Sequence, residues 1–207
     1  MPLTKPTAAQ INFDATNITD PLILLNSGES GSADKDTGLV IERGSDTNVG
    51  IIWDESADLF ALINTNETGT TSGNVTISSY ANLQCGIITG TTIKDYSETV
   101  YAGGNTSTAV TLDETNGNVQ TFTMTGNCTF TMPSGSGLPA GTSLTLILTQ
   151  DGTGSRTGAF TSVKWASGTA VTLTTTATSG IDILTFYTFN GGASPVWYGF
   201  ASGLAMA

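Results

Sequence analysis

Few residues of this chain have side chains suited to catalysis. Histidine is absent from the 207 residues, and with it the most common general base and the most common metal ligand. No Ser-His-Asp or Cys-His arrangement can therefore form. The two cysteines, Cys85 and Cys128, are more typical of small buried hydrophobic residues than of a disulfide framework, and whether they pair stays open.

A glycine-rich loop is the strongest candidate for a phosphate site. In LILTQDGTGSRTGAFTSVKW, Gly152, Gly154 and Gly158 surround Arg156. A Walker-type loop needs G-x-x-x-x-G-K-[ST], and a dinucleotide loop needs a helix to begin at its end. Neither condition is met, because the sequence that follows the loop has a strand pattern. We expect a connection between strands in which glycine supplies positive φ angles.

Two groups of carboxylates could bind metal or cleave glycosides. DKDTG, residues 34–38, matches the start of a calcium loop, but the twelfth position holds Ser45 in place of the bidentate glutamate. Asp54, Glu55 and Asp58 fall within one turn, whereas the two carboxylates of a glycosidase face each other across a cleft. We therefore predict no enzyme, no catalytic residue, no cofactor and no metal.

Aromatic side chains offer one possible binding site. A platform for sugar rings could be formed by Trp165, Tyr187, Trp197 and Tyr198. The same residues could equally pack in a core or between subunits. Both interpretations stay open at this stage, with packing favoured.

Composition limits the partners. The formal net charge is −11, which disfavours nucleic acid and anionic lipid. The amino terminus, MPLTKPTAAQ, has no hydrophobic signal core, and the longest apolar runs are too short to span a bilayer. We expect folding and assembly in a cytoplasm, with no membrane insertion.

The elements that would hold any site are strands, since the chain is rich in Thr, Ser, Asn and Gly. Residues 1–37 are predicted to form an extended anchoring arm that orders only on another surface. Residues 38–96 are predicted to form a β-meander and stalk. Its apolar runs, at 38–43, 49–53 and 59–63, are separated by polar turns.

The meander is apolar on both faces and needs partners on both. We expect identical copies to cover it, as an intertwined homotrimer. The packing residues are predicted to be Leu39, Ile41, Ile51, Trp53, Phe60 and Leu62.

Residues 97–207 are predicted to form an antiparallel β-sandwich head, because seven strand-like runs alternate with turns. TLTTTATSG, residues 172–180, fits either a strand edge or an ordered loop. The predicted fold class is thus all-β, with very little helix.

Two stretches resemble known proteins. GLVIERGSDTNVGIIWDESADLFAL, residues 38–62, resembles a strand-rich module of structural proteins from tailed bacteriophages, especially marine and cyanobacterial ones. Residues 144–201 resemble the carboxy-terminal β-domain of phage tail fibre and related appendage proteins. In that stretch LTQD-x-TG-x-R, V-x-W, LTTTA, DILTF and WYGF occur in the family's order.

The resemblance implies a homotrimeric fibre, appendage or decoration component of a virion, attached to capsid, tail or baseplate through residues 1–37. It supplies no catalytic residues. Two alternatives remain. One is a capsid decoration protein that stabilises the shell, and the other is a carbohydrate-binding adhesin module that attaches to a host surface glycan.

Overall fold

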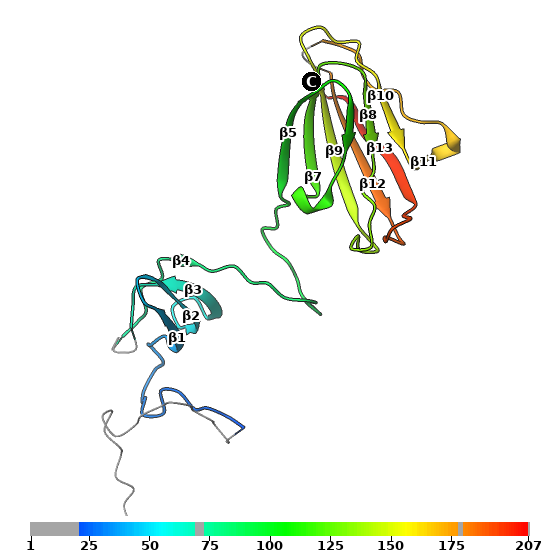
Figure 1. Ribbon diagram of the computed structural model, residues 1–207. Helices are drawn as coiled ribbons and strands as arrows, with labels where there is room; N and C mark the ends of the chain where they lie inside the picture. Colours follow the sequence, from blue (N-terminus) through cyan, green and yellow to red (C-terminus); the bar gives the residue numbers. More distant parts are fainter. Residues whose placement is uncertain (1–20, 69–72, 178–179, 207) are drawn as a thin grey trace, which may run out of the picture. The chain divides into compact units, whose positions relative to one another are not determined.

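The computed structural model describes residues 21–68, 73–177 and 180–206. The predicted all-β class is confirmed, since helix is limited in this part of the chain to two single 3-10 turns, Glu114–Asn116 and Ala166–Gly168. The chain divides into two compact units, Met1–Thr91 and Thr92–Ala207 (Figure 1). The predicted anchoring arm, residues 1–37, lies partly outside the described residues, which begin at residue 21.

The first unit contains one antiparallel sheet with the strand order β1-β2-β3-β4. The predicted three-strand meander is present, and a two-residue strand is added at its edge. In this sheet Ile51 lies opposite Leu39 on one side and Leu62 on the other. The strands are β1 (Thr37–Arg43), β2 (Asp46–Asp54), β3 (Leu59–Thr65) and β4 (Ser79–Tyr80).

One face of this sheet is covered by the chain itself. Ile52, Ala61 and Ile63 are buried, with Val75 and Ile77 packed against them. These two covering residues belong to the segment between β3 and β4, which crosses back over the sheet. The prediction that both faces need outside partners is therefore wrong for this face, because a neighbouring segment of the same chain covers it.

The second unit contains a six-stranded sheet of order β11-β13-β12-β9-β7-β5 and a three-stranded sheet of order β10-β8-β6 (Figure 1). Its strands are β5 (Val100–Thr106), β6 (Ala109–Thr111), β7 (Val119–Met124), β8 (Cys128–Thr131), β9 (Ser143–Gln150), β10 (Gly158–Thr161), β11 (Val163–Trp165), β12 (Ile181–Thr188) and β13 (Trp197–Met206).

The two sheets enclose one core, as in a sandwich. Phe130 of β8 contacts Phe122 of β7, with ring centroids 6.1 Å apart, and Phe160 of β10 lies 5.8 Å from Phe186 of β12. Strand alternation explains the packing. In β9 the leucines at 144, 146 and 148 are buried, while the residues between them are only partly buried.

Pairing in this sandwich is mixed, which differs from the expected antiparallel arrangement. Only β9, β12 and β13 pair antiparallel, while β5–β7, β7–β9, β11–β13 and the whole three-stranded sheet are parallel. The reason is the path of the chain. From β5 to β11, consecutive strands alternate between the two sheets. Strands two apart in sequence are therefore parallel neighbours from β5 to β10, whereas β11 lies beside β13 and not beside β9.

A single residue makes the last of these crossings. Ser162 has φ 63° and separates β10, in the smaller sheet, from β11, in the larger one. No strand forms over residues 172–177, so the described part of TLTTTATSG is an ordered loop. Among the described residues, no helix has the length and apolar character needed to cross a membrane.

Candidate functional site

The glycine-rich loop joins β9 to β10 and is closed by its own side chains. Asp151 accepts hydrogen bonds from the backbone amides of Thr153, at 3.1 Å, and Gly154, at 2.9 Å. Its carboxylate also binds the Arg156 guanidinium, with Nε at 3.2 Å and Nη2 at 2.8 Å. Gln150 accepts from the Arg156 amide and donates to the Arg156 carbonyl, both at 2.9 Å.

These bonds decide what the loop can do. A phosphate site needs free backbone amides and a free cation. Here the amides of Thr153, Gly154 and Arg156 and the guanidinium are all engaged within the loop. The Arg156 side chain lowers the pKa of Asp151, and Asp151 raises that of Arg156. The loop is a stabilised connection between strands.

Several carboxylates of the first unit are also engaged. Asp54 accepts from the Ser56 hydroxyl at 2.7 Å and the Ala57 amide at 3.1 Å, which closes the β2–β3 turn. Lys35 pairs with Glu29 and lies 3.7 Å from Asp34. The described residues contain no cluster of three or more His, Cys, Asp or Glu placed to bind a metal ion.

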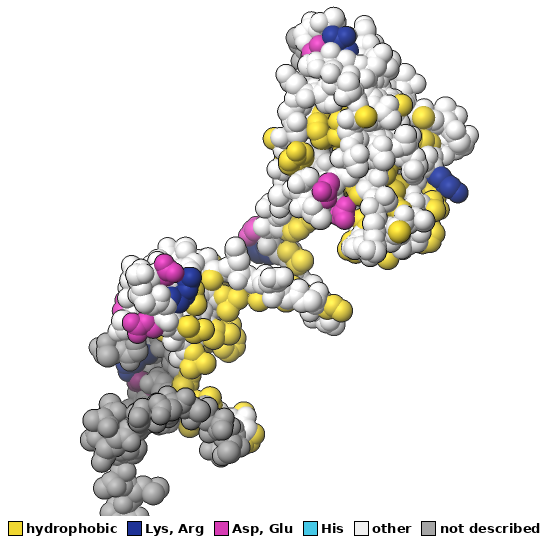
Figure 2. All heavy atoms as spheres, viewed as in Figure 1, with side chains coloured by type: hydrophobic (Ala, Val, Ile, Leu, Met, Phe, Trp, Pro, Cys, Tyr) yellow, Lys and Arg dark blue, Asp and Glu magenta, His cyan; other side chains and the backbone are white. Residues whose placement is uncertain are grey.

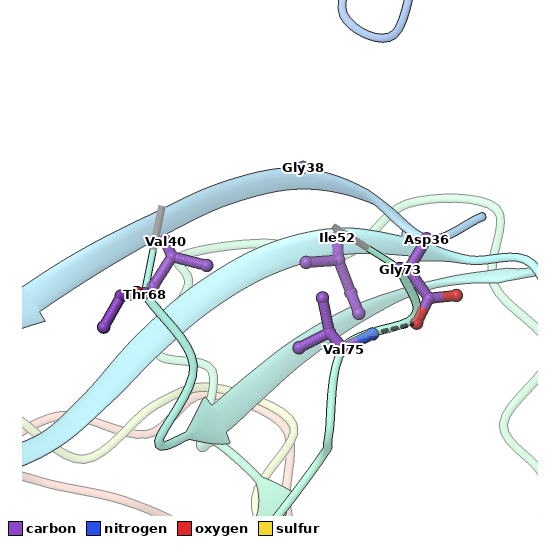
Figure 3. Close-up of a pocket in the computed structure, with 7 residues that line it drawn as sticks. All are labelled: Asp36, Gly38, Val40, Ile52, Thr68, Gly73 and Val75. Atoms are coloured by element: carbon purple, nitrogen blue, oxygen red, sulfur yellow. Dashed lines mark hydrogen bonds between the residues drawn. The ribbon is translucent and has the colours of Figure 1, made fainter. Parts of the chain in front are cut away.

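A small pocket lies beside Asp36, between β1, β2 and the segment that follows β3 (Figure 3). The carboxylate of Asp36 accepts from the Val75 amide at 2.8 Å and from the Glu55 amide at 3.0 Å. It thereby holds the covering segment over the sheet. The facing walls are aliphatic, from Val40, Ile52 and Val75, and the charged lining residue, Asp36, is engaged in attaching the segment.

The four aromatic candidates do not form one platform. Trp197 is fully buried and donates from Nε1 to the Pro133 carbonyl at 2.9 Å. Trp165 packs in the core against Phe160 and Phe186, at centroid distances of 5.4 and 5.8 Å. Tyr187 and Tyr198 lie opposite each other on the outer face of the six-stranded sheet. Because side chains alternate along a strand, the adjacent residues Trp197 and Tyr198 point to opposite faces.

The outer face has an aromatic strip that the sequence analysis missed in part. Phe189 stacks on Tyr198 with centroids 6.0 Å apart, and Phe200 is 57% exposed near Tyr187 along the same face. In YTFNGGASPVWYGF, aromatic residues recur at every second position, at 187 and 189 and again at 198 and 200. Only the β12–β13 register brings the two halves of the strip together.

The six predicted packing residues of the meander lie on one face, opposite the covered one. We call this the open face. In the single chain Phe60 is 76% exposed, Ile41 61% and Ile51 50%, and Figure 2 shows hydrophobic side chains gathered on the first unit. The members of the open face are Leu39, Ile41, Val49, Ile51, Trp53, Phe60 and Leu62.

Apolar side chains dominate the open face, and it also has polar members, Thr37 opposite Trp53 and Asn64 opposite Val49. The indole Nε1 of Trp53 donates to the Glu55 carboxylate at 2.8 Å. Trp53 and Phe60 meet edge to face, with centroids 5.1 Å apart. A shallow hollow in the face is lined by Ile41, Val49, Gly50, Ile51, Leu62, Ala81 and Asn82. The face can bury apolar surface.

Both cysteines are free thiols. Cys85 is exposed and Cys128 is buried in the sandwich, where burial raises its pKa.

Comparison of the chain with protein-family models, with curated proteins and with solved structures finds no match.

Proposed function

We propose that this chain is a non-catalytic structural subunit of a virion, a short homotrimeric fibre or appendage component that assembles through the open face. The open face itself is the observation that carries the proposal. It presents seven apolar side chains with no charge among them, and exposed apolar patches of this kind mark interaction sites.

A second copy of the chain is the partner that best fits this face. The chain has a net charge of −11, so copies repel one another overall and can join only through a surface that carries little charge, such as the seven apolar side chains of the open face. Every copy carries the same apolar face, and in a cyclic assembly the faces of neighbouring copies can bury one another.

The free energy gained by burying the open face is of the same size as the cost of association. Burial of a half-exposed aliphatic or aromatic side chain contributes about 1 kcal/mol. Seven such side chains on each of two copies therefore contribute on the order of 10 kcal/mol. This is comparable to the cost of association, about 4–15 kcal/mol.

The virion assignment rests on the resemblance of residues 38–62 and 144–201 to phage structural proteins. Engagement of the loop and carboxylate groups in structural hydrogen bonds agrees with a non-enzymatic role. Residues 1–37 attach the subunit to another virion protein in this proposal. Their described part supports it, because the four side chains of residues 22–25 are all exposed.

Two variants test the assembly. Ile51→Lys and Phe60→Lys place a charge on the open face without removing a buried side chain. We expect three times the 21.2 kDa chain mass for the natural protein in light scattering after gel filtration, and the single-chain mass for each variant. Phe200→Lys is the matched control, since Phe200 is similarly exposed but lies in the second unit. A natural protein that stays a single chain at micromolar concentration contradicts the proposal.

Location on the particle tests the virion role. Labelled antibody on purified particles, viewed by electron microscopy, is expected to mark a tail or capsid appendage. Regular labelling over the whole shell instead indicates a capsid decoration protein. Absence from all particles contradicts both.

The aromatic strip favours one further candidate, a glycan-binding module. Stacking on exposed ring faces is how aromatic side chains hold sugars. A glycan array with the full chain and with Tyr187→Ala tests it. Uniformly absent binding eliminates this candidate.

A further inference from the structure

The segment that joins β4 to β5 has no partner within the described chain. Residues 82–98 form no helix or strand (Figure 1), and no backbone hydrogen bond joins them to other described residues. A Cβ placed on Gly86 or Gly90 meets no atom within 4 Å, so nothing packs against the segment there. Backbone groups left unpaired in this way are normally paired in the assembled state or solvated.

The segment is nevertheless rich in large apolar side chains. Ile87 is 88% exposed, and four others are 60–67% exposed: Leu83, Ile88, Ile93 and Tyr96. Bends at Gly86, Gly90 and Asp95 divide it into short extended runs, each of which presents one or two of these side chains. A solvated linker is normally polar, so this composition calls for an apolar partner.

The charge of the segment indicates which partner can lie against it. Residues 82–98 contain one lysine, Lys94, and two acids, Asp95 and Glu98, so the segment has a net charge of only −1 in a chain of net charge −11. Copies of this segment can therefore lie together with little of the repulsion that opposes contact between other parts of the chain.

The segment also begins at the open face. Asn82, its first residue, and the preceding Ala81 line the hollow together with Ile41 and Leu62. Copies joined through their open faces therefore bring the starts of their segments close together. Tethering of this kind raises the effective concentration of one segment for another.

We propose that residues 82–98 of three copies lie side by side, parallel and in register, with their apolar side chains facing a common axis and backbone groups paired between chains. This rests on the homotrimer of the proposed function. Parallel direction follows from cyclic symmetry, which gives every copy the same direction along the axis.

The parallel, in-register arrangement can be tested with a cysteine of the natural chain. Cys85 is exposed and lies in the segment, whereas Cys128 is buried. In-register chains bring the Cys85 residues of two copies within reach of a disulfide, which needs Cα atoms about 4.4–6.8 Å apart. Copper–phenanthroline with oxygen accepts the two electrons and two protons released when two thiols join.

The experiment uses the full chain, with solution mass measured first. For the trimer we expect covalently linked pairs on a non-reducing gel, with a yield that does not change on dilution. One Cys85 thiol in three should remain free, in addition to the buried Cys128 thiols. Cys85→Ser should give no linked pairs. Ile87→Lys should slow linkage about tenfold, because three like charges meet at the axis. Thr153→Lys, on an exposed loop of the second unit, should not slow it.

The outcomes separate the two proposals. A trimer in which Cys85 does not link overturns the parallel segment and leaves the proposed function intact. A single-chain mass overturns both. Linkage that falls on dilution shows random collision and also overturns the segment proposal.

Discussion

Asp182 and Thr174 are joined by two hydrogen bonds at once. The Asp182 carboxylate accepts from the Thr174 amide at 2.6 Å and from its hydroxyl at 2.7 Å. It also accepts from the Ala205 amide at 3.1 Å. The side chain is 1% exposed, so these donors compensate for the loss of water. This carboxylate therefore connects the 172–177 loop and the end of β13 to β12.

Asp182→Ala is expected to destabilise the sandwich. The substitution leaves the Thr174 amide and hydroxyl without their acceptor, at a cost of about 2–3 kcal/mol, while the Ala205 amide keeps its hydrogen bond to the Thr174 hydroxyl oxygen at 3.0 Å. Guanidinium unfolding followed by tryptophan fluorescence measures the change. Thr145→Ala, on the outer side of β9, is the control and should change the free energy of unfolding by less than about 0.5 kcal/mol. Equal effects of the two substitutions contradict this role for Asp182.

The Asp151–Arg156 pair predicts a pH dependence. The Arg156 side chain lowers the pKa of Asp151 in the folded state, so the pair stabilises the fold above the pKa of the unfolded chain, about 3.9. That stabilisation is lost as the pH falls through the lower folded pKa.

Asp151→Asn tests this dependence. The natural protein should melt at a higher temperature than the variant at pH 7, and the difference should shrink below about pH 4. Thermal unfolding followed by circular dichroism from pH 7 to pH 2 measures it. A difference that grows toward low pH refutes the assignment.

Asp36→Ala is expected to release the segment over the covered face. The amides of Val75 and Glu55 lose their shared acceptor, at about 1–3 kcal/mol. Hydrogen exchange with mass spectrometry should show faster exchange in a peptide that contains Val75, while peptides from the sandwich exchange at the natural rate. Asp34→Ala, at an exposed neighbour, serves as control. Unchanged exchange at Val75 would falsify the proposed attachment.

Because Trp197 and Tyr187 lie on opposite faces of the sheet, we expect substitutions at these two positions to change stability by unequal amounts. Trp197→Phe removes a buried indole and its bond to the Pro133 carbonyl, and should cost about 2–4 kcal/mol. Tyr187→Phe alters only a half-exposed ring on the outer face, and should change stability by less than about 0.5 kcal/mol. Thermal unfolding of both variants compares them, and similar losses contradict the assignment of opposite faces.

Local patterns predicted much of the fold. Alternation of apolar residues identified the three meander strands and most sandwich strands, because a half-buried strand repeats every two residues. The same alternation placed Leu39, Ile51 and Phe60 together before any partner was known. β5 was missed, since VYAGGNT has two adjacent glycines and few apolar residues.

The sequence by itself thus determined the strand class, the turn role of the glycine-rich loop and the membership of the open face, all of which depend on neighbouring residues and their period. Only the tertiary structure decided that β5 to β11 alternate between two sheets, that Trp197 lies inside while Tyr198 lies outside next to Tyr187, and that Val75 and Ile77 cover one face of the meander. The physical reason is that these features depend on register and on contacts between residues far apart in sequence, which no local period encodes.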